Sequence, residues 1–390
     1  MFFHKQISGM NIKKFSKFTH NILILFTLCI LTFPLFGQEG RFGNAWVNAD
    51  GSTTFHFEDS TAKNVKIICD CRLHRETLEI KKENYHKAKM QKDSTGVWTY
   101  TTPPLAPEVY TYMFEAEGKR SNDPKNPDSI RVRCDRMSTF IVDGTPQTQL
   151  YTSKPLKGRV DTVIFDNPLG KKSRGVLVYL PPQYDDNQQS YPVLYLLHGL
   201  NGNEYSWTER GRAIDIIDNL IAQGKAKPMI MVLPDANPEM LIGQKQDMGL
   251  FKNIMLYPSW NDLDFEKCYP ILDSFLCQKY RFSTTLGDRA VAGLSAGGKQ
   301  SANLVNMYDS TFSAVGLFSP VVGNKQLPNS KFAKYWIGGG QGDLFHHRIN
   351  KFRKRMQRNH IPYTMYNSVG GHTWRNWRVY FTEFSQTLFR

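Results

Sequence analysis

The stretch VAGLSAGG, residues 291–298, places a single serine, Ser295, between glycines at the point where a short apolar run ends. The run at 289–293 predicts a buried strand, and the residues from Gly297 onward predict a helix. A sharp turn from strand to helix requires small residues on both sides of the serine, because larger side chains would collide with the neighbouring elements. The pattern therefore predicts an exposed serine hydroxyl, with the N–H of Ala296 pointing into the same site from a helix N-terminus.

Outward from this turn, the chain from about residue 156 alternates short apolar runs with helical stretches. Helical periodicity is clearest at 211–225 and 264–280. The apolar runs mostly end in a small or polar residue and occur at 193–199, 229–235, 289–295, 314–320 and 334–340. Buried parallel strands joined by crossover helices have this pattern, so residues 156–390 are expected to form an α/β domain.

The preceding region, residues 41–145, reads as short strands separated by turns. The stretch at 108–119, EVYTYMFEAEGK, puts Tyr110, Tyr112 and Phe114 on one face with a period of two. Regular strand spacing without a helical period indicates a β-sandwich. Residues 146–155 are expected to link the sandwich to the α/β domain.

The first 37 residues have the features of a secretory signal peptide. A basic stretch leads into an apolar run at 22–36, which is shorter than the roughly 20 residues of a membrane span. Removal of residues 1–37 takes away four lysines and lowers the formal net charge from +14 to +10. We expect an exported protein, periplasmic or secreted, with no membrane span after processing.

The positive charge favours acidic partners but does not indicate nucleic acid, because Lys and Arg are spread along the chain without a nucleic-acid motif. The basic cluster at 346–358 is interpreted as the solvated face of an amphipathic helix. Five cysteines remain after processing, and an odd number argues against a full disulfide framework. At most one disulfide is expected among Cys69, Cys71 and Cys134, and neither a metal nor a cofactor is expected.

A serine nucleophile needs a base, and His372 is the favoured candidate because it follows a strand-like run on a glycine loop near the C-terminus. His198 is the competitor, but it directly follows an earlier strand. A structural role in supporting its loop is assigned to His198. The backbone N–H groups of Leu200 and Ala296 are expected to bind the oxyanion.

The third member of such a triad should lie between the serine and the histidine in the chain. Asp343 ends the intervening strand and is favoured. Asp309 is the rival, on or just after the helix that carries the serine. Asp235 also ends a strand, but it precedes the serine and is held as a substrate-side or structural residue.

These motifs, in order, resemble the esterase D and carbohydrate esterase family 1 branch of the α/β-hydrolases, which includes feruloyl, acetylxylan and enterochelin esterases. The resemblance covers roughly 156–390 and rests on HGLNGNEYSW, GRAIDIIDNLIAQGKAKPMIMVLPDAN, AVAGLSAGGKQ, GGGQGD and GGHTWRNW. It implies an α/β-hydrolase fold, with Ser295 as nucleophile, His372 as base and Asp343 as acid. Residues 41–145 resemble, more weakly, the immunoglobulin-like early-set domains that precede such esterases.

Four aromatic residues are candidate substrate contacts. Trp207 and Trp374 lie beside the site motifs, and Tyr257 and Trp260 lie in an insertion after the strand at 229–233. Together with the resemblance, they indicate an exported serine esterase that removes feruloyl or acetyl groups from a plant polysaccharide or oligosaccharide such as xylan. A siderophore or other non-carbohydrate esterase, and a non-catalytic binding protein on a hydrolase scaffold, are the alternatives. The sequence does not indicate an oligomeric state.

Overall fold

The computed structural model describes residues 40–71, 86–132, 135–153, 155–200, 202–239, 242, 264–329 and 332–390. The expected signal peptide, Cys134, Tyr257 and Trp260 lie outside these ranges. Within them, no helix has both the length and the apolar character needed to cross a membrane.

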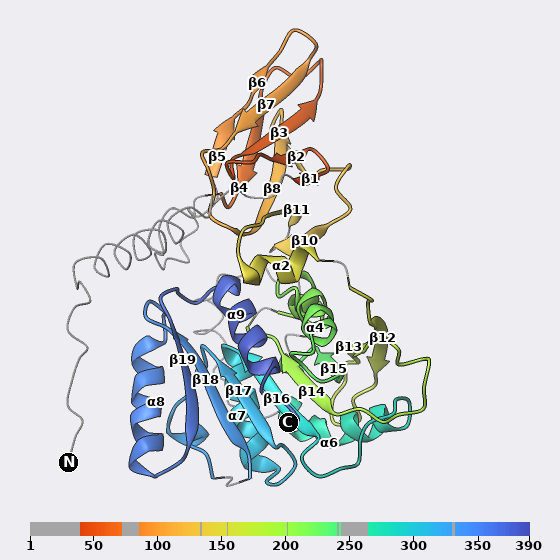
Figure 1. Ribbon diagram of the computed structural model, residues 1–390, viewed down its shortest axis with the longest axis vertical. Coiled ribbons are helices and arrows are strands. Elements are labelled where there is room, and N and C mark those ends of the chain that lie inside the picture. Colours follow the sequence, from red (N-terminus) through yellow and green to blue (C-terminus); the bar gives the residue numbers. More distant parts are fainter. Residues whose placement is uncertain are drawn as a thin grey trace, which may run out of the picture. The chain divides into compact units, whose positions relative to one another are not determined.

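Residues 40–142 contain two antiparallel sheets (Figure 1). The first has the order β1-β2-β3-β7-β6, and the second has the order β10-β11-β8-β4-β5, with β9 paired to β8. The strands are β1 (Gly40–Phe42), β2 (Ala45–Val47), β3 (Thr53–Glu58), β4 (Val65–Cys69), β5 (His86–Lys89), β6 (Gln91–Lys92), β7 (Val97–Thr101), β8 (Glu108–Ala116), β9 (Lys119–Ser121), β10 (Ser129–Val132) and β11 (Asp135–Val142).

The two sheets bury a common set of apolar side chains. Phe55 of the first sheet lies 5.1 Å, centroid to centroid, from Tyr112 of the second. Tyr110, Tyr112 and Phe114 are all fully buried in this cluster, which confirms that they share one face of the strand. Burial of these large rings is the main hydrophobic contribution to this part of the chain.

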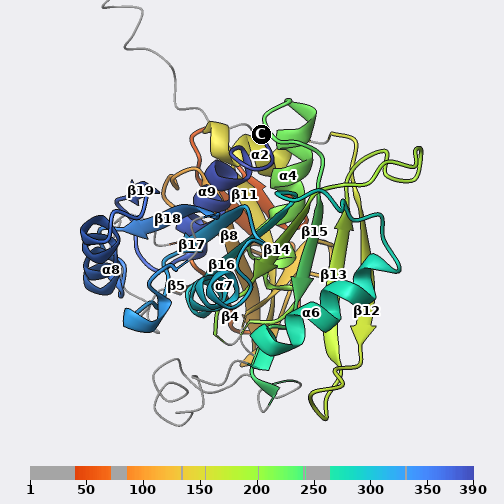
Figure 2. The ribbon, with the colours of Figure 1, turned by 90° about the horizontal axis from the view of Figure 1, so that it is seen from below.

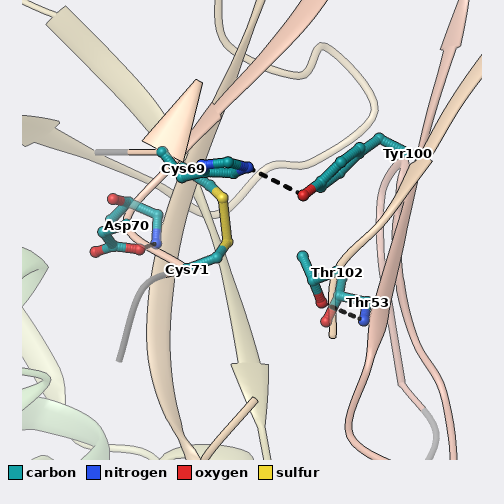
Figure 3. Close-up of a disulfide and its surroundings, with 8 residues drawn as sticks. Thr53, Cys69, Asp70, Cys71, Tyr100 and Thr102 are labelled. Atoms are coloured by element: carbon teal, nitrogen blue, oxygen red, sulfur yellow. Dashed lines mark hydrogen bonds between the residues drawn. A yellow bond between two sulfur atoms is a disulfide. The ribbon is translucent and has the colours of Figure 1, made fainter. Parts of the chain in front are cut away.

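A disulfide joins Cys69 at the end of β4 to Cys71, two residues further on (Figure 3). Asp70 lies on the turn between the two cysteines, where its Oδ1 accepts a hydrogen bond of 2.7 Å from the backbone N–H of Thr111. Burial raises the pKa of the Asp70 carboxyl to about 6, although the bond from Thr111 acts in the opposite direction.

Residues 146–155, expected to be a linker, contain the helix α2 (Pro146–Thr152). Thr145 caps this helix through a reciprocal hydrogen-bond pair with Thr148, and Pro146 occupies its first turn. Leu150 and Tyr151 are buried against the following α/β region. Residues 146–152 of the expected linker are therefore helical, and their apolar side chains pack on the α/β region.

The remainder of the chain forms one eight-stranded sheet with the order β12-β13-β15-β14-β16-β17-β18-β19. The strands are β12 (Arg159–Phe165), β13 (Arg174–Leu180), β14 (Val193–Leu197), β15 (Ile230–Pro234), β16 (Arg289–Leu294), β17 (Ala314–Phe318), β18 (Lys334–Gly340) and β19 (Tyr363–Ser368). The six strands from β14 to β19 run parallel, as the sequence predicts. β12 and β13 are antiparallel additions at one edge, since no crossover helix separates them.

Helices cover both faces of this sheet (Figure 2). The helices α6 (Asp264–Cys277), α7 (Ala296–Met307) and α8 (His346–Arg358) pack on one face. The helices α4 (Ala213–Ala222) and α9 (Trp374–Ser385), together with α2, pack on the other. Short helices also occur at α3 (Ser206–Glu209) and at the 3₁₀ turn η3 (Asn324–Gln326).

The order of the strands determines where a site can form. The chain passes from β14 to β15 on one side and then returns to β16 on the other side of β14. Parallel α/β sheets bind their ligands at such a reversal, beyond the carboxyl ends of the strands. The residues that directly follow β14, β15 and β16 are His198, Asp235 and Ser295.

Candidate active site

Ser295 lies in a strained turn between β16 and α7. Its φ of 54° and ψ of −111° are unusual for a residue with a side chain. A Cβ atom on Gly293 would lie 2.4 Å from the carbonyl group of Gly297, and one on Gly297 would lie 2.3 Å from the carbonyl oxygen of His198. Both glycines are therefore required by close contacts between the strand, the helix and the loop after β14.

The structure brings Ser295, His372 and Asp343 into one hydrogen-bonded chain. His372 Nε2 lies 2.9 Å from Ser295 Oγ, and His372 Nδ1 lies 3.1 and 3.2 Å from the two carboxylate oxygens of Asp343. A carboxylate can only accept, so Nδ1 carries the proton and Nε2 is free to accept the hydroxyl proton of Ser295. This arrangement activates a serine oxygen as a nucleophile.

Asp343 is held by the loop that follows β18. Its backbone N–H donates to Gly340 O at 3.2 Å, and its Oδ1 accepts a bond of 2.8 Å from the N–H of Phe345. Burial is the largest influence on the Asp343 carboxyl and would raise its pKa. The hydrogen bond and charge of His372, with the bond from Phe345, outweigh it and lower the pKa.

The imidazole of His372 is fixed by two aromatic rings as well as by hydrogen bonds. Phe345 contacts it edge to face at 5.1 Å, and Trp377, in the first turn of α9, does so at 4.9 Å. The amide of Asn376 donates to Gly371 O at 2.8 Å and anchors the glycine loop. These contacts restrict rotation of the ring and keep Nε2 aimed at Ser295.

His198 is buried beside the serine and connects two loops. Its Nε2 accepts a bond of 3.0 Å from the N–H of Ala236, so its Nδ1 carries the proton and donates to Gly199 O at 2.7 Å. With both nitrogens occupied, His198 is placed to support the loop that carries Leu200.

The two rival acids do not contact His372. Asp235 is buried, and its Oδ1 accepts from both the backbone N–H and the side-chain amide of Asn237. Asn237 in turn donates to Gly202 O at 2.8 Å, so Asp235 stabilises the loops after β14 and β15. Asp309 is exposed just beyond the end of α7, away from the site.

A pocket lies beside Ser295 at the edge of the sheet, with about 390 Å³ of space when the open solvent at its mouth is included. Leu200 and Ala296, the two expected oxyanion donors, both line it. Ala296 is the first residue of α7, so its N–H has no acceptor within the helix and adds to the positive end of the helix dipole.

Of the aromatic candidates for substrate contact, Trp207 and Trp374 lie within the described residues, and they differ in exposure. Trp207 is only 1% exposed, and its indole N–H donates to Leu197 O at 2.9 Å, so it is a core residue and not a substrate contact. Trp374 is partly exposed and contacts Trp207 edge to face at 5.3 Å. Trp207 was a candidate because it lies beside the site motifs in the sequence, but its side chain packs in the core beneath the loops.

Glu266, in the first turn of α6, also lines the pocket, and the sequence reasoning did not identify it. The sequence feature that could have identified Glu266 is an acidic residue on a helix face otherwise occupied by apolar residues such as Phe265 and Tyr269. Among the described residues there is no group of three or more His, Cys, Asp or Glu side chains arranged to hold a metal ion.

The family described as "Putative esterase" matches residues 169–336. The chain is also 29% identical, over 359 residues, to a protein of Xylanibacter ruminicola named endo-1,4-beta-xylanase/feruloyl esterase. That alignment covers 88% of this chain and 46% of the relative, so the chain spans about half the length of the curated relative that it matches.

Among solved structures, an enterobactin esterase of Shigella flexneri, determined in the presence of enterobactin, is similar with a TM-score of 0.59 and 17% identity. The similarity covers 90% of this chain and 95% of that one. A ferulic acid esterase of Anaeromyces mucronatus in complex with ferulic acid has a TM-score of 0.51 and 21% identity, covering 61% of this chain and 94% of that one. The eight-stranded sheet and its helices have an α/β-hydrolase-like fold, and the family match and the curated relative support a carboxylic-ester hydrolase.

Proposed function

We propose that the chain is a serine esterase in which Ser295 is the nucleophile, His372 the general base and Asp343 the orienting acid. The observation that supports this most directly is the continuous hydrogen bonding from Ser295 Oγ through His372 to Asp343, with distances of 2.9 and 3.1 Å. These distances and the order of the three groups support transfer of the serine proton to His372 during acyl transfer.

In the proposed reaction, Ser295 Oγ attacks the ester carbonyl as its proton passes to His372 Nε2. The backbone N–H groups of Leu200 and Ala296 stabilise the oxyanion of the tetrahedral intermediate. When the intermediate collapses, His372 returns the proton to the alcohol oxygen, and the acyl group remains on Ser295. A water molecule then attacks the acyl carbon as its proton passes to His372. The bond from the acyl carbon to Ser295 Oγ breaks, His372 returns the proton to Oγ, and the acid is released.

The proposed substrate is a feruloyl or acetyl ester on a plant polysaccharide such as xylan, or on its oligosaccharides. The name of the Xylanibacter ruminicola relative supports this choice. The proposal includes export by the segment at 1–37, to the periplasm or outside the cell. It also takes residues 41–145 as an immunoglobulin-like early-set β-sandwich, for which the two antiparallel sheets are the support.

A siderophore esterase is the second candidate. The similarity to the Shigella flexneri enterobactin esterase extends over 90% of this chain, whereas that to the Anaeromyces mucronatus enzyme covers 61%. The positive net charge of +14 would also suit an anionic ligand.

The test is hydrolysis of methyl ferulate, 4-nitrophenyl acetate, acetylated xylan and ferric enterobactin by the wild-type protein and by Ser295→Ala. Release of ferulate or acetate by the wild type, with rates lower by about 10⁴ or more in the variant, supports the polysaccharide esterase. Cleavage of ferric enterobactin alone supports the siderophore esterase. Binding of any of these compounds without hydrolysis would instead indicate a binding protein and would contradict the proposal.

A further inference from the structure

The pocket beside Ser295 reaches from the oxyanion donors to the start of α6. Its described lining residues come from the loops after β14 and β15 and from the helices α6 and α7, and they include Leu200, Glu266, Ala296 and Lys299. None of them comes from the loop that carries His372. In ester hydrolysis the alcohol oxygen must receive its proton from His372, so the alcohol lies on the His372 side of the serine. The pocket is therefore placed to receive the acyl part of the ester.

Glu266 is a buried carboxyl group in this pocket and is only 2% exposed. Its Oε1 accepts a hydrogen bond of 2.8 Å from the side-chain amide of Asn303. Asn303 Oδ1 in turn accepts a bond of 3.0 Å from the amide of Gln326. This series of bonds fixes the carboxyl group from one side, so its position does not depend on a ligand.

The second oxygen, Glu266 Oε2, is buried and has no hydrogen-bond partner in the described part of the chain. An unsatisfied buried acceptor is unfavourable for the folded state, and a ligand that supplies a donor would recover that free energy. A carboxyl oxygen that is rigidly held, buried and unpartnered in a pocket is a feature of a binding site.

The charge of Glu266 favours a neutral polar group over an anion as the ligand of its Oε2. Lys299 lines the same pocket, and its positive charge acts on the negative charge of Glu266. Burial raises the pKa of Glu266 and lowers the pKa of Lys299, and the attraction between the two opposite charges acts against both shifts. A carboxylate or phosphate on the ligand would be repelled by Glu266, whereas a hydroxyl can bond to Oε2 in either protonation state.

We propose that Glu266 is a specificity-determining residue whose Oε2 hydrogen-bonds a hydroxyl group on the acyl part of the substrate ester. This inference rests on the proposed esterase function. Sites built to bind a hydroxyl discriminate strongly against analogues that lack it, because the polar group of the protein is then left unpaired.

The experiment compares methyl 3-(4-hydroxyphenyl)propanoate and its 3-hydroxyphenyl isomer with methyl 3-phenylpropanoate. The saturated chain separates the ring from the ester, so the hydroxyl does not change the reactivity of the carbonyl group. We expect the wild type to have a kcat/KM at least about 10-fold higher for one hydroxylated ester than for the plain one. In Glu266→Leu this ratio should fall close to one, because kcat/KM for the hydroxylated ester falls further than kcat/KM for the plain ester.

Two further variants keep the test decisive if Glu266→Leu folds poorly. Glu266→Gln retains an acceptor for Asn303 and a polar group towards the pocket. It should therefore keep part of the preference for the hydroxylated ester over the plain ester. Asp309→Leu, an exposed acid outside the site, is the matched control and should keep all of it. The proposal would be overturned if the wild type did not prefer either hydroxylated ester to the plain one. It would also be overturned if folded Glu266→Leu protein lost kcat/KM equally on the hydroxylated and plain esters.

Binding separates this proposal from the proposed function. In the Ser295→Ala background, calorimetry should show tighter binding of the hydroxylated ester than of the plain ester, and a Glu266→Leu, Ser295→Ala double variant should remove the difference. Preferential binding that depends on Glu266, without hydrolysis by the wild type, supports the role of Glu266 while the esterase proposal fails. Hydrolysis of both esters without any Glu266-dependent difference overturns only the role of Glu266.

Discussion

Glu108 and Arg378 form a buried ion pair of 2.7 Å between β8 of the antiparallel sheets and α9 of the α/β region. Arg375, one turn earlier in α9, approaches the other carboxylate oxygen of Glu108 at 3.3 Å. The helix begins at Trp374, two residues after His372. One carboxylate of the N-terminal sheets therefore stabilises the first turns of the helix that follows the imidazole.

Glu108→Ala should lower both stability and activity. The side chain of Arg378 is 6% exposed, and loss of its partner leaves a buried charge without compensation. The expected cost is about 3–5 kcal/mol in the free energy of unfolding, measured by urea denaturation. Glu58→Ala is the control, because Glu58 forms an exposed pair with Lys125, and its removal should change the free energy of unfolding far less. Equal costs for the two variants would show that the buried pair does not hold α9.

Asp343→Asn should reduce kcat on 4-nitrophenyl acetate by about 10⁴, since an amide cannot hold the imidazole of His372 in the tautomer that accepts the serine proton. Asp235→Asn should cost far less, because the Asp235 side chain contacts Asn237 and the imidazole of His198 but not that of His372. Circular dichroism spectra of both variants check that they are folded. The opposite ranking of the two variants would assign the acid to Asp235.

Gly297→Ala should disrupt the site through a steric clash. The new Cβ would lie 2.3 Å from the carbonyl oxygen of His198 and 2.7 Å from that of Leu197, so the loop carrying Leu200 must move. We expect a loss of about 1–3 kcal/mol in unfolding free energy and a large fall in kcat. Gly323→Ala is the matched control, because its nearest neighbouring atom would be 3.6 Å away. Normal activity in Gly297→Ala would contradict the tight packing inferred for this turn.

Asp70→Asn should change the dependence of stability on pH. The folded-state pKa of Asp70, about 6, lies above the ordinary aspartate value of 3.8, so the folded wild type binds this proton more tightly than the unfolded chain does. The contribution of the Asp70 carboxyl to the free energy of unfolding is therefore fully present below about pH 4. It is lost as the pH rises to about 6. The asparagine keeps the acceptor for the N–H of Thr111. Because its amide does not ionise, it avoids the loss of stability as the pH rises. Melting temperatures from pH 4 to 8 should diverge in favour of Asp70→Asn above pH 6, and parallel curves would contradict the raised pKa.

The order of strands and helices around Ser295 could be predicted because apolar runs and glycines reflect what each short segment needs to form a strand, a turn or a helix. The run before Ser295 is a strand, and the residues after it are a helix, since both patterns follow from periodicity in sequence. The proximity of Ser295, Asp343 and His372 followed from the order of the strands in a parallel sheet, whose carboxyl ends meet at one edge.

Other features depend on contacts between distant residues and leave little trace in the sequence. Glu266 has one satisfied and one unsatisfied oxygen only because Asn303, on another helix, approaches it from one side. The burial of Trp207 likewise depends on Trp374 and Phe381, which lie far away in the chain. A tryptophan near a motif is equally compatible with a cleft and with a core, and only packing decides between them.

The backbone of Ser295 means that the reactive residue is also a point of conformational strain. A φ of 54° with a ψ of −111° is readily adopted by glycine but costs a residue with a side chain about 1–3 kcal/mol. The neighbouring glycines and the loop after β14 must hold the serine in this conformation. A glycine at position 295 would relieve the strain and stabilise the fold while abolishing the hydroxyl. Selection for thermal stability alone would thus act against the serine, and its retention requires a benefit from its chemistry.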